Sequence, residues 1–198
     1  MSKRLFDWVL ASLGLLVLSP ALLLVALAIK LDSPGPVFFR QERVGRFGQP
    51  FRIHKFRTMR HAPQSVGPQI TVGTDRRITR IGHALRGSKF DELPQLIDVW
   101  LGRMSLVGPR PEVPRYVAHY PATVRDKVLS VRPGITDLAS IEYRDESRVL
   151  ARSPDPEQAY IHEILPHKLA LAVRYVDQAS VWTDIRLIAR TLAAIVKG

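Results

Sequence analysis

The segment VLASLGLLVLSPALLLVALAI, from Val9 to Ile29, carries no charged residue over 21 positions and is the strongest constraint on the fold. At about 1.5 Å per residue, a straight helix of this length would reach roughly 31 Å, enough to cross the apolar part of a bilayer. The segment is too long for the apolar region of a secretory signal peptide, which has about 7–15 residues. We therefore expect a membrane-embedded helix.

Ser19 and Pro20 divide this apolar segment almost in half. Pro20 has no N–H to donate to the carbonyl of Leu16, and its ring crowds the preceding turn, so we expect a bend there. The Ser19 hydroxyl can satisfy a carbonyl that is freed one turn earlier. Each arm would then be about 15 Å long, which is close to one leaflet of the bilayer.

Basic residues flank the apolar segment on both sides. They are Lys3 and Arg4 before it, and Lys30, Arg40, Arg43 and Arg46 after it. The positive-inside rule assigns such flanks to the cytoplasm, so both ends favour the same side. We predict a re-entrant (helix-break-helix) membrane helix over residues 1–32, broken at Ser19-Pro20, and a cytoplasmic domain over residues 33–198. A single-pass helix that tolerates its proline and a buried core helix remain alternatives.

The composition restricts the class of protein further. The 198 residues include no cysteine, which excludes a disulfide framework, a thiolate metal site and a cysteine nucleophile. The net charge of +11 implies an anionic partner, which can be nucleic acid, anionic lipid or a phosphorylated small molecule.

The remainder predicts an α+β fold that is mostly helical. Short β-type runs at Pro36–Val44 and Pro50–Met59, with Gly48 between them, predict a small β-hairpin. Residues 61–74 are typical of a loop. Further helices are expected from Pro94 to about Leu101 and over residues 112–118, 122–130, 157–176 (interrupted at Pro166) and 180–197.

The last of these helices is amphipathic. Its apolar residues recur at intervals of three or four and are Val181, Ile185, Ile188, Leu192, Ile195 and Val196. Such helices lie in a membrane interface, with an apolar face buried among the lipids. Ordinary packing against the domain core is the alternative.

Asp91 and Glu92 are the best candidates for chemistry. They follow a stretch rich in arginine and lysine, which should keep carboxylates ionised and attract phosphates. Adjacent residues on a helix diverge by about 100°, which suits two different tasks. An aspartate can attack phosphorus, and a neighbouring glutamate can bind Mg²⁺ together with phosphate oxygens. The plainer alternative is that the pair complements a helix dipole.

Three further arginines are candidates for phosphate binding because of the short motifs in which they occur. They are Arg43 before Val-Gly, Arg57 in Lys55-Phe-Arg-Thr-Met59, and Arg110 in Gly108-Pro-Arg-Pro111. Guanidinium groups bind phosphate bidentately, and neighbouring Gly and Pro can aim a side chain. Each arginine could equally be an ordinary surface cation. The six histidines show no metal-ligand spacing.

Taken together, the chain resembles the monotopic polyprenyl-phosphate phosphoglycosyl transferases, the bacterial sugar transferase family, in its small catalytic-core form. The resemblance covers nearly the whole chain in order. Its motifs are Lys3–Asp7, Ser19-Pro20, Ser33–Gln41, Arg43–Gly45, Lys55–Met59, Leu85-Arg86, Asp91–Gln95, Met104–Pro111, Arg132–Thr136 and Trp182–Asp184. The chain departs from the usual pattern at Lys89-Phe90, at Asp137 and at Ser140.

The resemblance implies that a sugar-1-phosphate passes from a UDP-sugar to a polyprenyl (undecaprenyl) phosphate with release of UMP, initiating bacterial glycoconjugate assembly (capsule, O-antigen, exopolysaccharide or glycoprotein glycan). Asp91 would be the nucleophile that forms a covalent phosphosugar intermediate, and Glu92 would bind Mg²⁺. Lys55, Arg57, Arg86, Arg110 and Pro111 match positions that would contact the substrate.

The expected location is the cytoplasmic face of the bacterial inner membrane, in contact with lipid and without nucleic acid; a homodimer is left open. The competing interpretation is a non-enzymatic basic scaffold or nucleic-acid tether anchored at a membrane. That alternative explains the charge and the apolar segment but not an acidic pair set among cations. Aromatic residues, at 8%, are not interleaved with the basic runs as in a stacking platform.

Overall fold

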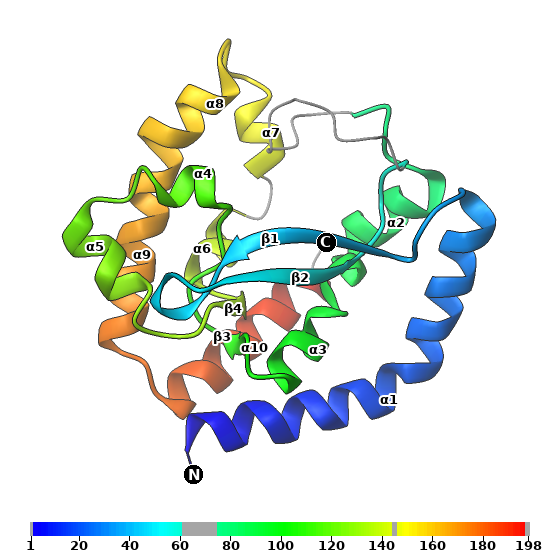
Figure 1. Cartoon of the computed structure of the whole chain (residues 1–198), viewed down its shortest axis with the longest axis horizontal. Coiled ribbons are helices and arrows are strands. Elements are labelled where there is room, and N and C mark those ends of the chain that lie inside the picture. Colours follow the sequence, from blue (N-terminus) through cyan, green and yellow to red (C-terminus); the bar gives the residue numbers. More distant parts are fainter. Residues whose placement is uncertain (1, 61–74, 144–145, 197–198) are drawn as a thin grey trace.

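A computed structural model describes residues 2–60, 75–143 and 146–196 and is mostly helical, with two small sheets (Figure 1). The helices are α1 (Lys3–Asp32), α2 (Arg80–Ser88), α3 (Gln95–Trp100), α4 (Pro114–Val117), α5 (Ala122–Val128), α6 (Leu138–Glu142), α7 (Glu146–Leu150), α8 (Pro156–Ala159), α9 (Leu165–Asp177) and α10 (Val181–Val196). The strands are β1 (Phe38–Val44), β2 (Pro50–Phe56), β3 (Ser105–Val107) and β4 (Gly134–Thr136). Short turns lie at η1 (Arg46–Gly48), η2 (Phe90–Glu92) and η3 (Tyr160–Ile164). The loop predicted over residues 61–74 lies outside the described residues.

The predicted β-hairpin is confirmed, with somewhat shorter strands. β1 pairs antiparallel with β2, and its register runs from Phe38 opposite Phe56 to Val44 opposite Pro50. Its turn uses a left-handed backbone at Phe47 (φ 58°) and Gly48 (φ 76°). A second, parallel pair, β3 with β4, was not predicted, because strands of three residues are too short to show alternation.

Helix α1 bends in its middle but does not break, which corrects the helix-break-helix prediction. The helix is continuous from Lys3 to Asp32 with Pro20 inside it, and Figure 1 shows its two arms at a clear angle. The Ser19 hydroxyl donates to the carbonyl of Leu16 at 2.8 Å. Pro20 cannot donate to this carbonyl because it has no backbone N–H. One substitute hydrogen bond therefore lets the helix continue through the bend.

The N-terminal end of α1 is fixed to the domain by polar contacts. The Lys3 ammonium lies 2.5 Å from a carboxylate oxygen of the buried Asp184, so the start of the first helix is joined to the last one. Arg4 donates to the carbonyl oxygens of Val99 at 2.6 Å and Trp100 at 2.9 Å, at the end of α3.

The other end of α1 is fixed to the same domain by one arginine. Arg57, just after β2, is only 4% exposed. Its guanidinium donates to the carbonyl oxygens of Ser33 at 2.6 Å, Pro34 at 2.9 Å and Ile29 at 3.2 Å. Ile29 lies in the last turn of α1, and Ser33 and Pro34 directly follow the helix. Both ends of α1 are thus held by one folded unit.

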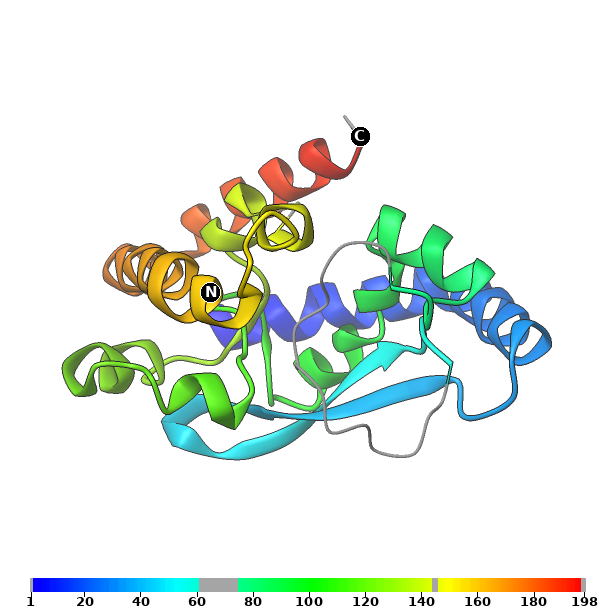
Figure 2. The same cartoon turned by 90° about the horizontal axis from the view of Figure 1, so that it is seen from above.

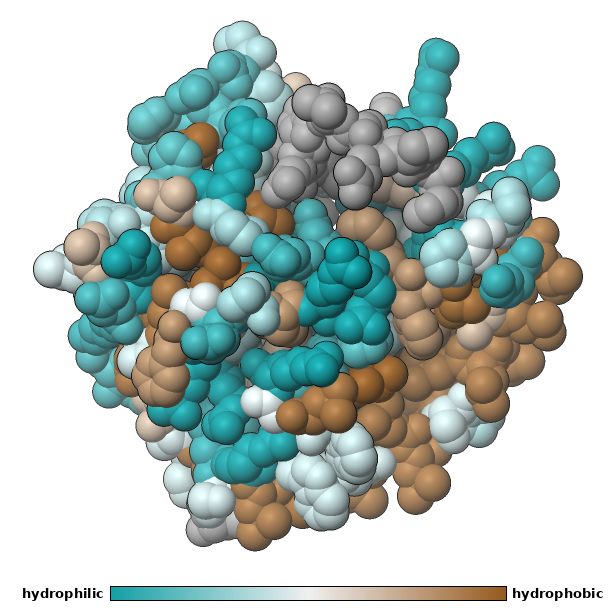
Figure 3. All heavy atoms as spheres, viewed as in Figure 1, coloured by the Kyte–Doolittle hydropathy of each residue, from teal (hydrophilic) through white to brown (hydrophobic). Residues whose placement is uncertain are grey.

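Along its length α1 has one face against the domain and one exposed apolar face. Ala11 and Ile29 are buried in the core, whereas Leu16, Val17 and Leu23 are each more than 70% exposed. The most apolar 18-residue stretch of the helix has a mean hydropathy of 2.5, and the helix is long and apolar enough to cross a membrane. Figure 3 shows hydrophobic surface gathered over the side of the molecule where Figure 1 places α1.

The remaining elements form a scaffold around α1 and the hairpin. In the view from above, α9 and α10 lie on one side and α2 on the other, with the hairpin along one edge (Figure 2). Asp98 of α3, which is fully buried, accepts hydrogen bonds from the backbone N–H of His54 and bonds to its ring nitrogen, both at 2.8 Å. This joins α3 to β2.

The C-terminal helices follow the sequence prediction with adjustments. The stretch predicted over residues 157–176 divides into α8, the π-type turn η3 and α9, and Pro166 lies in the first turn of α9 instead of interrupting it. In α10, Leu187 packs in the core while Trp182 is 78% exposed. A place for α10 in a membrane interface stays a prediction.

Gly134 tests the close approach that builds the β3–β4 pair. A Cβ at this position would lie 2.1 Å from the backbone N of Gly108, so Gly134→Ala should lower the free energy of unfolding by about 3 kcal/mol. In α2, a Cβ at Gly87 would meet nothing within 4 Å. Gly87→Ala should therefore raise the free energy of unfolding by about 0.5 kcal/mol, because alanine favours the helix more than glycine does. Denaturant unfolding in lipid nanodiscs measures both; equal effects of the two changes would contradict the packing described.

Candidate functional site

Asp91 and Glu92 lie in the tight turn η2, between α2 and α3. Lys89 takes a left-handed backbone conformation (φ 60°, ψ 14°), which ends α2 and sends the chain directly into η2. The pair precedes α3, whose N-cap is Pro94. The residues therefore lie in a short helical turn just before α3 and not in the first turn of α3 itself.

Glu92 is held by two cations from different parts of the fold. Lys55 of β2 donates to Glu92 Oε1 at 2.7 Å. Arg110, in the loop after β3, donates to Oε2 at 2.9 Å and also to Oε1, so that its guanidinium grips the carboxylate with both arms. All three side chains are mostly buried, with exposed fractions of 16–29%.

The two adjacent carboxyls have opposite electrostatic environments. Burial raises the pKa of Asp91 above its ordinary value, and the charge of Lys55 opposes this only in part. Burial alone would also raise the pKa of Glu92, but the charges of Arg110 and Lys55 hold that pKa well below its usual range. Glu92 is therefore a fixed anion. Within residues 2–60, 75–143 and 146–196, no pair of cations hydrogen-bonds the buried Asp91 in the same way, which leaves its carboxylate less stabilised.

A cavity of about 720 Å³ opens in front of Asp91 and Glu92. Its lining includes Lys55, Arg86, Lys89 and Arg110 together with the two acidic residues, and also Arg43, Lys168, Glu112 and Glu146. The volume lies within the range of small-molecule sites, about 300–1,000 Å³. The six cations outnumber the four carboxylates, which fits a ligand with several negative charges, such as a diphosphate.

A second buried charge network surrounds Glu112, beside the contacts of Lys55 and Arg110 with Glu92. Its carboxylate accepts from the Tyr160 hydroxyl at 2.5 Å and lies 3.4 Å from Lys168 and 3.7 Å from Arg43. Burial would raise the pKa of Glu112, yet the charges of Lys168 and Arg43 lower it, so the group stays ionised. Arg43 also donates to the carbonyl of Pro111 at 2.9 Å. The network thus fixes the loop that carries Arg110.

The backbone of Arg110 is held in addition by Asp137. Asp137 Oδ2 accepts from the Arg110 N–H at 3.1 Å, while Oδ1 accepts from the N–H of Ser140 at 2.6 Å and caps α6. The residue is only 3% exposed. The departure from the resembled pattern at position 137 therefore has a structural role next to the site.

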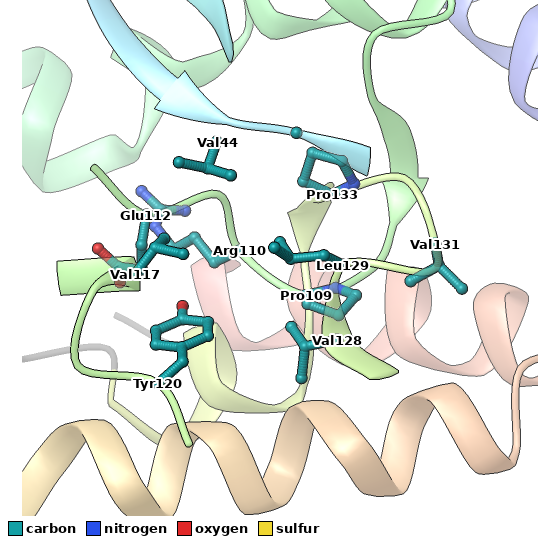
Figure 4. A pocket seen from close by; sticks show the side chains of 11 residues that line it. Val44, Pro109, Arg110, Glu112, Val117, Tyr120, Val128, Leu129, Val131 and Pro133 are labelled. Atoms are coloured by element: carbon teal, nitrogen blue, oxygen red, sulfur yellow. The ribbon is translucent and has the colours of Figure 1, made fainter. Parts of the chain in front are cut away.

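A second, much smaller cavity lies near Arg110 and Glu112 and is bordered by Tyr120 and Val128 (Figure 4). Its volume of about 10 Å³ holds at most about one water molecule. It is too small for a substrate.

The structure brings together most of the predicted site residues. Lys55, Arg86, Asp91, Glu92 and Arg110 all line the large cavity. Arg57 and Pro111 are not among its lining residues. The terminal guanidinium nitrogens of Arg57 donate to carbonyls at the end of α1, and the buried Pro111 supplies a carbonyl to Arg43. Their assignment as substrate contacts gains no support from their positions.

Sequence reasoning missed Glu112, Asp137, Tyr160 and Lys168. Glu112 directly follows the Gly108–Pro111 segment, and this adjacency was the one available signal. Lys168 lies 56 residues from Glu112 in sequence, so no spacing rule connects the two.

No cluster of three or more metal-ligating side chains occurs among residues 2–60, 75–143 and 146–196. Among these described residues, Lys55 and Arg110 both donate to Glu92 Oε1. Only Arg110 donates to Oε2, which therefore keeps a lone pair. A divalent ion here would need most of its ligands from substrate oxygens and water.

Comparisons with known proteins point to one family. The family described as bacterial sugar transferase matches residues 1–198. The chain is 39% identical to the UDP-glucose:undecaprenyl-phosphate glucose-1-phosphate transferase of Caulobacter vibrioides, over 98% of this chain and 69% of that protein. It is 38% identical to the protein of the same name from Escherichia coli, over 96% of this chain and 39% of that protein. It is 35% identical to the UDP-N-acetylgalactosamine-undecaprenyl-phosphate N-acetylgalactosaminephosphotransferase of Aeromonas hydrophila, over 99% of this chain and 44% of that protein. The chain thus spans less than half the length of the last two.

Arg57 and Arg86 test which of the predicted arginines belongs to the cavity and which holds the fold together. Arg57→Gln removes the donors of three carbonyls at the end of α1 and should lower the free energy of unfolding by about 2–4 kcal/mol. Arg86→Gln, at the cavity wall, should change it by less than about 0.5 kcal/mol. Denaturant unfolding compares them, and the reverse order would refute the assignment.

Proposed function

The chain belongs to the bacterial sugar transferase family, and on that premise we propose that it transfers a sugar-1-phosphate from a UDP-sugar to a polyprenyl phosphate and releases UMP. This reaction initiates the assembly of a glycan on a lipid carrier. Two of the relatives are named for glucose and one for N-acetylgalactosamine, so the proposal extends to UDP-sugars as a class.

The observation that carries the proposal is the pairing of a clamped Glu92 with an unclamped, buried Asp91 at the cationic end of the cavity. Both substrates of this reaction are phosphates, and their approach to each other and to a carboxylate nucleophile is opposed by charge. Arg86, Lys89 and Arg110 offset that repulsion. A non-enzymatic membrane scaffold would need the cations but not the acidic pair.

In the first step, an oxygen of Asp91 attacks the β-phosphorus of the UDP-sugar. A bond forms between this oxygen and phosphorus, and the bond from phosphorus to the bridging oxygen breaks, with its electron pair leaving on UMP. The product is an acyl phosphate that carries the sugar. The raised pKa of Asp91 makes its carboxylate a stronger nucleophile than a fully solvated one, provided that the pH lies above this pKa.

In the second step, an oxygen of the polyprenyl phosphate attacks the same phosphorus. The bond between phosphorus and the Asp91 oxygen breaks, and its electron pair returns to the carboxylate. The enzyme is regenerated, and the lipid leaves as a diphosphate-linked sugar. One site thus serves a soluble donor and a membrane acceptor in turn, which avoids binding two repelling anions together.

Mg²⁺ is part of the proposal. The free lone pair of Glu92 Oε2 fits a single protein ligand, and Mg²⁺ commonly uses one or two carboxylates together with phosphate oxygens and water. When bound, the ion would neutralise charge on the diphosphate. Lys55 and Arg110 would keep the Glu92 carboxylate ionised and oriented for this role.

We further propose that α1 is re-entrant, so that the chain is monotopic in the bacterial inner membrane with its catalytic domain on the cytoplasmic face. Lys3 and Arg4 bind one folded unit at the start of α1, and Arg57 of that same unit binds its end. A straight helix across a bilayer of about 30 Å would place its ends on opposite sides. The bend at Pro20 and the shared anchor support a helix that returns to the side it entered.

Asp91→Asn tests the nucleophile. An amide does not attack phosphorus, so UMP release from a UDP-sugar, with Mg²⁺ and polyprenyl phosphate present, should fall by about a thousandfold or more. Intact-protein mass spectrometry without acceptor should show a sugar-phosphate adduct on the native chain and none on the variant. Asp126→Asn, at a carboxylate that is 80% exposed, should stay within about twofold of native. Full turnover by Asp91→Asn would refute the assignment.

Cysteine labelling tests the topology against a background of no native thiols. Ser2→Cys and Pro34→Cys should both react with an impermeant maleimide in inverted membrane vesicles and be protected in intact spheroplasts. Pro20→Ala should favour a straighter helix and increase labelling at position 2 in spheroplasts. Labelling of position 2 only from the periplasmic side of the native sequence would indicate a spanning helix.

A further inference from the structure

The large cavity is lined by apolar side chains as well as by charged and polar ones. The apolar set includes Leu10 of α1, Leu96 of α3 and Ile188, Leu192 and Ile195 of α10. None of these side chains carries a hydrogen-bonding group. The helices α1 and α10, far apart in sequence, thus line the same space.

Thr191, the polar side chain that α10 contributes to the cavity wall, is already hydrogen-bonded. Thr191 of α10 donates to the carbonyl of Leu187 at 2.9 Å, and its hydroxyl pairs with that of Thr136 at 2.7 Å. A nucleoside or a hexose buried here would leave its hydroxyls without partners, at a cost of about 1–3 kcal/mol each. The apolar region therefore suits a hydrocarbon and not the donor substrate.

The mouth of this region opens toward the exposed face of α1. Leu192 is 59% exposed and Leu10 is 37% exposed. One turn further along α1, Leu13 is 51% exposed, and Leu16 follows at 72%. An apolar path therefore runs from the cationic end of the cavity to the helix face that we place in the membrane.

We propose that the isoprenoid chain of the acceptor phosphate lies in this apolar channel between α1 and α10. The inference rests on the proposed function, because it assigns a place to one of its two substrates. The phosphate meets Asp91 at the cationic end, and the chain leaves past Leu192 into the lipid. The donor makes no use of the channel.

The two half-reactions separate this inference from the function itself. Release of one equivalent of UMP without acceptor reports the first half-reaction, and steady-state transfer to undecaprenyl phosphate in lipid nanodiscs reports both. UDP-glucose is the first donor probe, followed by the UDP derivatives of galactose, N-acetylglucosamine and N-acetylgalactosamine.

Leu192→Glu places a charge in the channel. The UMP burst should stay within about twofold of native, while kcat/KM for undecaprenyl phosphate should fall at least about tenfold. Ile185→Glu is the matched control, since Ile185 is on the same helix, is 42% exposed and does not line the cavity. It should leave both readouts within about twofold. Leu192→Trp, which narrows the channel without a charge, should reproduce the selective loss for the lipid.

Equal losses in Leu192→Glu and Ile185→Glu would overturn the channel, because they would indicate a general effect on membrane attachment. Loss of the burst in both Leu192 variants would also overturn it, since the position would then serve the donor. Absence of a burst from the native chain with all four donors would instead overturn the proposed function.

Discussion

The bidentate grip of Arg110 on Glu92, completed by Lys55, is the interaction on which the site depends. It joins three segments that are distant in sequence: β2, the turn η2 and the loop after β3. Both cations hydrogen-bond Glu92, and their charges offset the burial of the adjacent Asp91 only in part. Two neighbouring carboxyls thereby acquire different electrostatic environments. Behind them, Arg43 and Asp137 hold the Arg110 loop in place.

The second constraint is that one folded unit anchors both ends of α1. Lys3 reaches Asp184 at one end, and Arg57 caps the helix at the other. This arrangement keeps a long apolar helix beside the cavity, so that the proposed membrane anchor and the candidate site are parts of one folded unit. In the proposed reaction, the acceptor phosphate would then be confined to the depth at which its headgroup already lies, which gives a gain from proximity.

Much of this organisation was predictable, and the exceptions have physical reasons. Uniform apolarity predicted α1, and Pro20 predicted its bend, but sequence could not show that the Ser19 hydroxyl keeps the helix continuous. Charge context identified Asp91 and Glu92 as candidates. Arg57 was grouped with Lys55 because the two share a motif, yet β2 ends at Phe56, and the alternation that would align their side chains ends with it. The strand pair β3–β4 and the contact of Glu112 with Lys168 are non-local and leave no periodic signal.

The asymmetry of the acidic pair is the central claim, and the protonation of each carboxyl tests it most directly. Isotope-edited infrared titration of the ¹³C-carboxyl-labelled protein, assigned with Asp91→Asn and Glu92→Gln, measures both groups. The pKa of Asp91 should lie above its ordinary value of 3.8, and that of Glu92 should lie well below 4.5. A Glu92 carboxyl that takes up its proton at higher pH than Asp91 would contradict the account.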